Sequence, residues 1–236
     1  MSIAENVARV RERMAAAARR AKRAPEEITL MAVSKTVEPE RIRQAYDADV
    51  RVFGENRVQE FEEKVPALKA LGGCEWHLVG HLQSNKAVKA AELFDGIDSV
   101  DSLRLAQKLN AAAVELNRKL KVLIEINIGG EATKSGVAAD SQELEQILRA
   151  APQLYSLQIA GLMAIPPFTD DPEGVRPYFR RMRELRDQIA RRKLPQATMA
   201  VLSMGMTHDF EVAIEEGSTR VRIGTAIFGE RPRPKL

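Results

Sequence analysis

Short apolar runs, several of them β-branched, alternate with amphipathic helical segments along the whole chain. Each run has the length of a strand and is separated from the next by a segment with helical spacing of its apolar residues. This alternation predicts parallel βαβ connections, and eight such runs are enough to close a (β/α)8 TIM barrel. The runs lie at residues 28–35, 50–56, 74–80, 96–102, 121–128, 157–165, 199–205 and 219–229.

An open doubly wound sheet is the alternative arrangement. The barrel is favoured because the eighth run is followed by too little chain for a full helix. A helix within residues 1–24, begun by the capping-box pair Ser2 and Glu5, has no preceding strand and could cover that gap. Because no linker divides the sequence, we predict a single domain over residues 1–236, with a short basic tail at 230–236.

Charge and cysteine usage narrow the class of protein. A net charge of +3, from 36 basic and 33 acidic residues, is too small to predict a nucleic-acid partner. Cys74 is the sole cysteine, which fits a reducing compartment and a structural, unreactive thiol. No apolar run reaches the length of a membrane span or of a signal peptide. We expect a cytoplasmic monomer with no membrane contact.

The arginines of the segment 175–193 form a separate charged feature. We interpret them as the solvated outer face of a helix, with an acidic partner or RNA as the alternative.

Two glycine turns follow the seventh and eighth runs, where TIM barrels frequently bind phosphate. Gly205 and Gly224 permit close approach of the backbone to a ligand, and Ser203 and Thr225 add hydroxyl groups. Either turn alone is more typical of an ordinary strand-to-helix connection. Both turns on neighbouring strands indicate an anion site.

Lys35 ends the first run, which neighbours the eighth in a closed barrel. A partly desolvated amine at the tip of a buried strand has a lowered pKa and can form a Schiff base. The alternative is a lysine that extends into solvent. A Schiff-base lysine beside a phosphate site would suit either pyridoxal phosphate (PLP) or a phosphosugar.

Arg222 lies two residues before Gly224 and therefore on the same face of the strand. A guanidinium below the phosphate site could reach the pyridine nitrogen of a flat ring. Because it can only donate hydrogen bonds, it would keep that nitrogen unprotonated and weaken the ring as an electron sink. The alternative is an ion pair with a buried carboxylate such as Glu125.

The motifs AVSKT, FGENRVQE, WHLVGHLQSNK, INIGGEATKSG, GLMAIPPF and LSMGMTHDFEVAIEEGSTRVRIGTAIFG resemble those of the pyridoxal phosphate homeostasis proteins, the YggS/PROSC family. The resemblance runs from about residue 28 to 231. It implies the fold of the alanine racemase N-terminal barrel and a non-catalytic carrier of PLP that contributes to vitamin B6 and amino-acid balance. The cofactor-binding residues that it implies are Lys35, Asn56, Ser203, Met204, Arg222, Gly224 and Thr225.

The resemblance implies phosphate contacts from Ser203, Gly224 and Thr225. The resemblance places PLP on Lys35 as a Schiff base, and it places Arg222 near the ring nitrogen. Asn56 has an alternative role, since with Gln59 it could cap the helix that follows.

Catalysis would require a second base on the opposite face of the cofactor, which alanine racemases take from a separate domain. The sequence has no length left for such a domain, and Tyr46, Tyr155 and Tyr178 fall on expected helices or helix ends. We therefore expect no vigorous turnover. A weak amino-acid racemase and a Schiff-base lyase acting on a phosphosugar remain the alternatives.

His77, His81 and Lys134 are possible flanks of the pocket. The two histidines lack a clustered third ligand, so we predict no metal site. Lys134 lies in the loop after the fifth run and could hand PLP over to apo-enzymes, the possible protein partners of such a carrier. Its replacement is then expected to alter transfer more than equilibrium loading.

Overall fold

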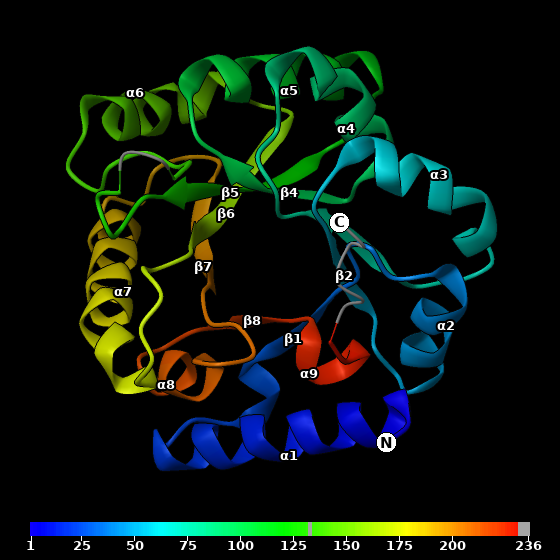
Figure 1. Ribbon diagram of the computed structural model, residues 1–236. Helices are drawn as coiled ribbons and strands as arrows, with labels where there is room; N and C mark the ends of the chain where they lie inside the picture. Colours follow the sequence, from blue (N-terminus) through cyan, green and yellow to red (C-terminus); the bar gives the residue numbers. More distant parts are fainter. Residues whose placement is uncertain (132–133, 231–236) are drawn as a thin grey trace.

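Eight parallel strands close into a barrel (Figure 1). The structure is a computed structural model that describes residues 1–131 and 134–230. Each strand pairs with the next, and β8 returns to β1 with Met31 opposite Arg222. The predicted TIM barrel is therefore confirmed, and the open sheet is excluded. The strands are β1 (Thr29–Val33), β2 (Val52–Glu55), β3 (Glu75–Leu78), β4 (Gly96–Val100), β5 (Leu120–Ile126), β6 (Leu157–Ala164), β7 (Ala197–Ser203) and β8 (Arg220–Ile223).

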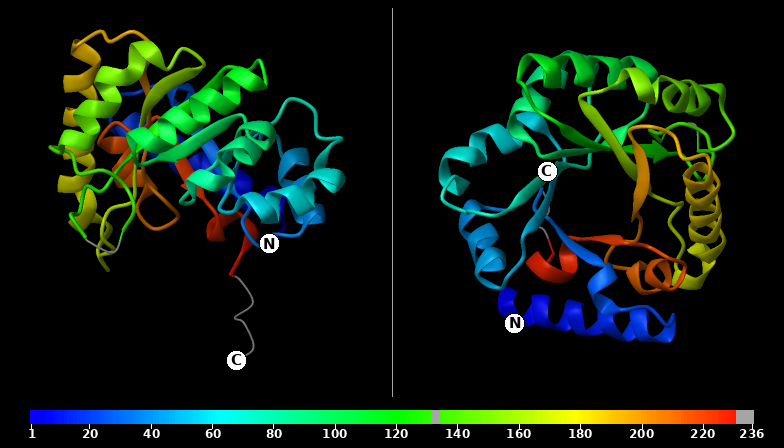
Figure 2. Two further views of the ribbon diagram at one scale, coloured as in Figure 1. Left: turned by 90° about the horizontal axis from the view of Figure 1, so that it is seen from above. Right: turned by 180° about the vertical axis from the view of Figure 1, so that it is seen from behind.

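Helices form a ring around the strands in both views along the barrel (Figures 1 and 2). The α-helices are α1 (Ile3–Arg20), α2 (Pro39–Asp47), α3 (Val58–Leu68), α4 (Ala87–Leu93), α5 (Leu103–Glu115), α6 (Gln142–Ala150), α7 (Arg176–Arg191), α8 (Phe210–Glu215) and α9 (Thr225–Phe228). Short 3-10 turns are η1 (Pro25–Glu27), η2 (Ser84–Lys86), η3 (Ala151–Gln153) and η4 (Pro172–Val175).

The first helix covers the place where the last unit lacks a full helix. Ser2 and Glu5 form the predicted capping box, which satisfies backbone donors at the start of α1. Its apolar face then packs against α2, α8 and the single turn α9. The N-terminal helix therefore lies beside the last unit, where only the single turn α9 follows β8.

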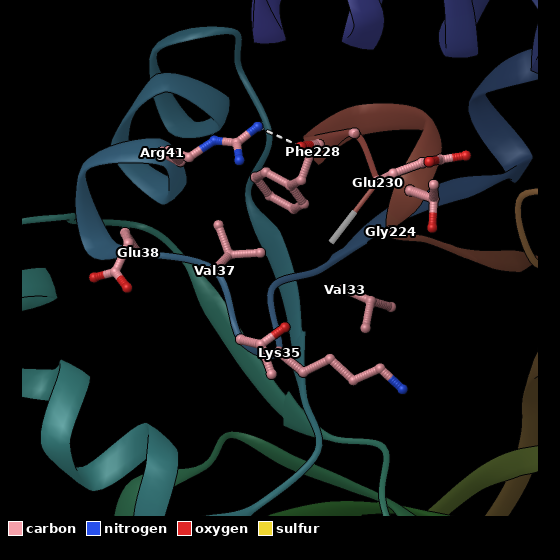
Figure 3. A pocket seen from close by; sticks show the side chains of 11 residues that line it. Val33, Lys35, Val37, Glu38, Arg41, Gly224, Phe228 and Glu230 are labelled. Atoms are coloured by element: carbon pink, nitrogen blue, oxygen red, sulfur yellow. Dashed lines mark hydrogen bonds between the residues drawn. The ribbon is translucent and has the colours of Figure 1, made fainter. Parts of the chain in front are cut away.

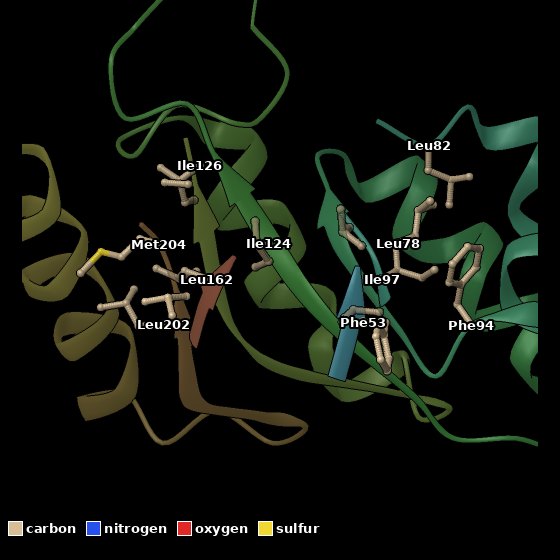
Figure 4. Packing of buried hydrophobic residues seen from close by; sticks show 14 of the residues in the cluster. Phe53, Leu78, Leu82, Phe94, Ile97, Ile124, Ile126, Leu162, Leu202 and Met204 are labelled. Carbon is tan, nitrogen blue, oxygen red and sulfur yellow. The ribbon is translucent and has the colours of Figure 1, made fainter. Parts of the chain in front are cut away.

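The main hydrophobic core lies between the strands and the surrounding helices. Its side chains project outward from the sheet and meet the inner faces of the helices (Figure 4). Burial of apolar surface is the dominant favourable term in folding, and here it fixes each helix against its own pair of strands. The carboxyl ends of all eight strands are thereby held in one rigid rim.

Charged groups fill the lower part of the barrel interior. Arg220 on β8 donates to Asp98 on β4 at 3.1 Å, and Asp98 also contacts Nδ1 of His77 at 2.8 Å. Burial opposes the charged imidazole, but the charge and hydrogen bond of Asp98 outweigh burial and raise the pKa of His77. Gly96 makes room for this ring, because a Cβ there would lie 2.3 Å from Nδ1.

The arginines of α7 are engaged mainly with acidic neighbours. Arg176, Arg180 and Arg183 contact Glu216, and Arg176 also contacts Glu215. These contacts pair this part of the helix with acidic side chains of the same chain. Within residues 1–131 and 134–230, no helix is long and apolar enough to cross a membrane. Residues 231–236 of the predicted tail lie outside the described residues.

Candidate functional site

A cavity of about 270 Å³ opens at the carboxyl ends of the strands. Five of the predicted cofactor-binding residues meet there: Lys35, Asn56, Arg222, Gly224 and Thr225. The remaining lining residues are Val33, Val79, Ile165, Phe168, Met206, Thr207 and His208. Residues from six separate parts of the chain thus form one small site, with a volume close to the lower end of the usual range for ligand pockets.

Lys35 extends from the loop after β1 and lines this cavity together with an adjoining hollow of about 150 Å³. In Figure 3 the side chain of Lys35 passes beside Val33, and Gly224 lines the same hollow. The residue is half-buried. On the far side of the hollow, Arg41 donates to the carbonyl of Phe228 and so connects α2 to the end of α9.

Arg222 is almost fully buried, with 4% of its surface exposed. Nη1 donates to the carbonyl and the hydroxyl of Ser203, at 2.8 Å each, and Nη2 donates to the carbonyl of Ala164 at 2.9 Å. These acceptors are uncharged, and burial lowers the pKa of Arg222. The alternative of an ion pair with Glu125 is not seen among the described residues. A positive charge therefore lies under the cavity, held by neutral groups.

Ser203 and Met204 are both fully buried and do not line the cavity. The hydroxyl of Ser203 accepts from Arg222. The side chain of Met204 packs in the outer core (Figure 4). The sequence prediction placed both residues on the cofactor, whereas the structure places the hydroxyl of Ser203 one contact away from the cavity, through Arg222.

The turn after β7 packs its backbone closely against α8. Gly205 has φ +94, and a Cβ there would lie 2.5 Å from that of Ala213, so the position requires glycine. Its carbonyl accepts from the backbone N–H of Arg222 at 3.0 Å. Gly224 then forms the N-cap of α9, and Thr225 begins that turn at the cavity wall.

Asn56 does not cap α3, contrary to the alternative offered by the sequence. The helix begins at Val58 with Arg57 at the N-cap and without a side-chain cap, so the predicted box with Gln59 is wrong. Asn56 lines the cavity instead, packed against Gly80. A Cβ at Gly80 would lie 2.2 Å from the backbone oxygen of Asn56, and this close approach gives no signal in the sequence beyond the glycine itself.

Of the predicted flanking residues, His77 is a correction. Its side chain points into the interior of the barrel toward Asp98, below the cavity. Successive side chains of a strand point to opposite faces of the sheet, and that of His77 is on the inner face of β3, with the other charged groups of the barrel interior. His81 and Lys134 line a second hollow of about 240 Å³ next to Asn56. Lys134 contacts Glu131 there and donates to the carbonyl of Pro166 at 3.2 Å.

Glu125 also faces this second hollow, with 8% of its surface exposed. Its Oε2 is buried and makes no hydrogen bond. Burial and then the nearby charge of Asp101 raise the pKa of Glu125 to about 7. Among residues 1–131 and 134–230, no three histidine, cysteine, aspartate or glutamate side chains gather in a way that could hold a metal ion.

The apolar rim of the cavity was not predicted from the sequence. Phe168 is 78% exposed, and its ring centroid lies 5.6 Å from that of His208. Met206 and Ile165 complete this rim. An apolar residue in a proline-rich loop after β6 was the available signal.

Cys74 lies away from the cavity. It is partly buried against the core, and burial raises the pKa of its thiol.

Known proteins share this arrangement over nearly the whole chain. The family described as alanine racemase, N-terminal domain, matches residues 3–232. The pyridoxal phosphate homeostasis protein of Aquifex aeolicus is 47% identical over 98% of this chain and 99% of its own length. The protein of the same name from Escherichia coli K12 is 46% identical over 99% and 98%. The chain belongs to the pyridoxal phosphate homeostasis protein family.

Solved structures agree with this family membership. PipY of Synechococcus elongatus is 38% identical, with a TM-score of 0.83 over 97% of this chain and all of its own, and one of its structures has PLP bound. An alanine racemase of Clostridium difficile has a TM-score of 0.75 at 16% identity, which shows a shared fold alone. This chain matches 58% of the racemase. The curated relatives of this family carry the name of a homeostasis protein rather than of an enzyme.

Proposed function

We propose that this protein binds PLP as a Schiff base on Lys35 and contributes to intracellular vitamin B6 and amino-acid homeostasis without vigorous catalysis. The observation that carries the proposal is the meeting of Lys35, Arg222 and the Gly224–Thr225 turn in one cavity. An amine, a buried guanidinium and a hydroxyl suit an aldehyde that also bears a phosphate and a ring nitrogen. Its membership of the homeostasis family and the PLP-bound structure of PipY support the same cofactor.

Five of the residues that line the cavity would contact the cofactor. Lys35 would bind the aldehyde carbon, the turn at Gly224 and Thr225 would hold the phosphate, and Asn56 would contact the ring. When bound, PLP supplies an electrophilic carbon and an electron-withdrawing ring. Because Arg222 only donates hydrogen bonds, it favours an unprotonated ring nitrogen and so limits that withdrawal.

The absence of vigorous catalysis rests on the groups that face the cavity. Tyr46 donates to the carbonyl of Gly72, and neither it nor Tyr155 nor Tyr178 is among the described residues that line the cavity. A tyrosine base on the opposite face from Lys35 is therefore not supplied by the part of the chain that the structure describes. Weak racemase activity and lyase activity on a phosphosugar are the outcomes to test against.

The deciding experiment is an absorbance spectrum of the purified protein with added PLP, before and after borohydride. Lys35→Ala is the test variant, and Lys134→Ala is the matched control, since Lys134 lies in the neighbouring hollow. We expect a visible Schiff-base band in the wild type and the control, bleached by borohydride and missing in Lys35→Ala. A protein that shows no band with PLP would overturn the proposal and favour the phosphosugar lyase.

Catalysis is tested on the same preparation. Incubation with single amino acids should give no rapid racemisation, transamination or decarboxylation, whereas robust turnover of any of them would contradict a carrier function.

We propose that Lys134 takes part in the transfer of PLP from this protein to apo-enzymes. Its position next to Asn56 places a second amine beside the cofactor cavity. Lys134→Ala should slow the transfer of PLP to an apo-enzyme while equilibrium loading stays within about twofold, a difference in free energy below ~0.5 kcal/mol. An unchanged transfer rate would contradict this role.

A further inference from the structure

Three charged side chains gather beside the segment that carries Lys35. Glu55 ends β2, while Glu60 and Lys64 lie one turn apart on α3 and therefore share a face of the helix. The amine of Lys64 lies 3.0 Å from Glu55 and 2.7 Å from Glu60. The side chains of Lys64 and Glu55 are 10% and 0% exposed, and that of Glu60 is 23% exposed, so two of the three members are almost completely buried.

The cluster binds the residue before Lys35 through both its side chain and its backbone. The hydroxyl of Ser34 donates to Glu55 at 2.7 Å, and the amine of Lys64 donates to the carbonyl of Ser34 at 2.9 Å. Ser34 itself is fully buried, and its N–H donates to Gly54 at 2.9 Å. The conformation of Ser34 is thereby fixed from two sides.

The residue after Lys35 is held by the same cluster. Thr36 has φ +60, a left-handed conformation that is rare for a β-branched residue. Its backbone N–H donates to Glu60, the carboxylate that also accepts from Lys64. Burial disfavours the charged carboxylate, but the hydrogen bonds from Lys64 and Thr36 outweigh burial and lower the pKa of Glu60. An uncommon backbone conformation thus persists next to Lys35 because the surroundings determine it.

We propose that Glu55, Glu60 and Lys64 form a clamp that positions Lys35, by fixing the backbone on both sides of it. The proposal rests on the proposed function, because it concerns the amine that would bind PLP. The clamp does not touch the cavity, since none of its three members lines it, so its members are positioning residues. Its effect reaches Lys35 through Ser34 and Thr36.

Positioning accounts for this cluster better than stability does. A buried ion pair adds little net stability compared with apolar side chains of the same volume. An amine whose direction is fixed in advance reacts faster, and a misplacement of about 1 Å can cost on the order of a hundredfold in rate. The lysine has several rotatable bonds, so a rigid Cα–Cβ direction is the contribution that its neighbours can make.

The test variant is Glu60→Ala, which removes the acceptor for Thr36, and the conservative variant is Glu60→Gln, which keeps it. Glu60 is 23% exposed, so its loss is less disruptive than that of Glu55. The matched control is Glu62→Ala on the same helix, whose 49% exposed side chain pairs with Lys89. Lys64→Met is a second variant, which removes the donor to the carbonyl of Ser34 and leaves Glu60 as the acceptor for Thr36.

The first readout is amide hydrogen exchange at Thr36 in the protein without PLP. Exchange should accelerate in Glu60→Ala and remain at the wild-type rate in the control. The second readout is the rate at which the Schiff-base band appears on addition of PLP, together with its visible circular dichroism. We expect the rate to fall about tenfold or more in Glu60→Ala and Lys64→Met. Glu60→Gln should restore it to within about threefold, a difference below ~1 kcal/mol.

Two results would overturn the clamp. One is unchanged exchange at Thr36 in Glu60→Ala. The other is faster exchange combined with a wild-type loading rate and dichroism, because the cluster would then serve stability alone. A wild-type protein that shows no Schiff-base band would instead reject the proposed function. The exchange experiment needs no cofactor, so it would still show whether Glu60 fixes the backbone of Thr36.

Discussion

The guanidinium of Arg222 makes two hydrogen bonds to Ser203, because its Nη1 donates to both the carbonyl and the hydroxyl of that residue, at 2.8 Å each. The two residues occupy β8 and β7, the pair of strands below the glycine turns. This contact makes the hydroxyl of Ser203 a support for Arg222, whereas the sequence suggested a direct phosphate ligand.

Replacement of Ser203 by alanine should therefore weaken PLP binding through Arg222. One hydrogen bond to a charged donor is lost while the backbone carbonyl remains. The expected effect is about 1 kcal/mol, or roughly a fivefold rise in the dissociation constant. Absorbance titration with PLP measures it. Thr219→Ala is a control that removes a hydroxyl bonded to β7 outside the cavity, and equal affinity of Ser203→Ala and wild type would contradict the role.

Glu125 should make the protein less stable as the pH rises. Its pKa is about 7 in the folded state against 4.5 for the ordinary group, so between these values the folded state holds a proton that the unfolded chain has lost. Stability is then fully present below about pH 4.5 and is lost as the pH approaches 7, by up to ~3 kcal/mol. Urea unfolding at several pH values measures this slope.

The Glu125→Gln variant should flatten that part of the pH profile, because an amide does not titrate. Glu62→Gln, at an exposed carboxylate on α3, should keep the wild-type profile. An unchanged slope in Glu125→Gln would show that Glu125 titrates near its ordinary value.

Gly80→Ala should destabilise the fold and displace Asn56. A Cβ at this position would lie 2.2 Å from a backbone oxygen, which cannot move as a flexible side chain would. We expect a loss of about 1–3 kcal/mol and weaker PLP binding. Thermal unfolding checks the first and titration the second. The control is Gly72→Ala, where nothing lies within 4 Å of the added carbon, and equal effects of the two substitutions would refute the explanation.

Asp98→Asn should damage the charged layer inside the barrel. Arg220 would keep its charge with its carboxylate partner gone, which costs about 3–5 kcal/mol for a buried pair. The pKa of His77 should fall, since the charge and hydrogen bond that raise it are lost. NMR titration of the His77 ring follows this change directly. A pKa of His77 that stays raised in the variant would assign the shift to Glu75 instead.

The sequence predicted the barrel because its information is local and repeated. Alternating periods along the chain require βαβ units, and the capping pair Ser2 and Glu5 marks the helix that closes the ring. Lys35, Gly224 and Thr225 could be placed at the site because the carboxyl ends of adjacent parallel strands meet by topology alone. Arg222 followed from the period of its strand, and Asn56 followed from the family resemblance alone.

What the sequence alone determined is the order of strands and helices and the end of the barrel at which the site lies. The tertiary structure decided which side chains reach the cavity: it turned His77 inward to Asp98, buried Ser203 beneath Arg222 and brought Glu60 to the backbone of Thr36. These partners lie 19 to 24 residues apart in the sequence. Such contacts depend on register and on the space left by neighbouring side chains, which arise only when the whole barrel has closed.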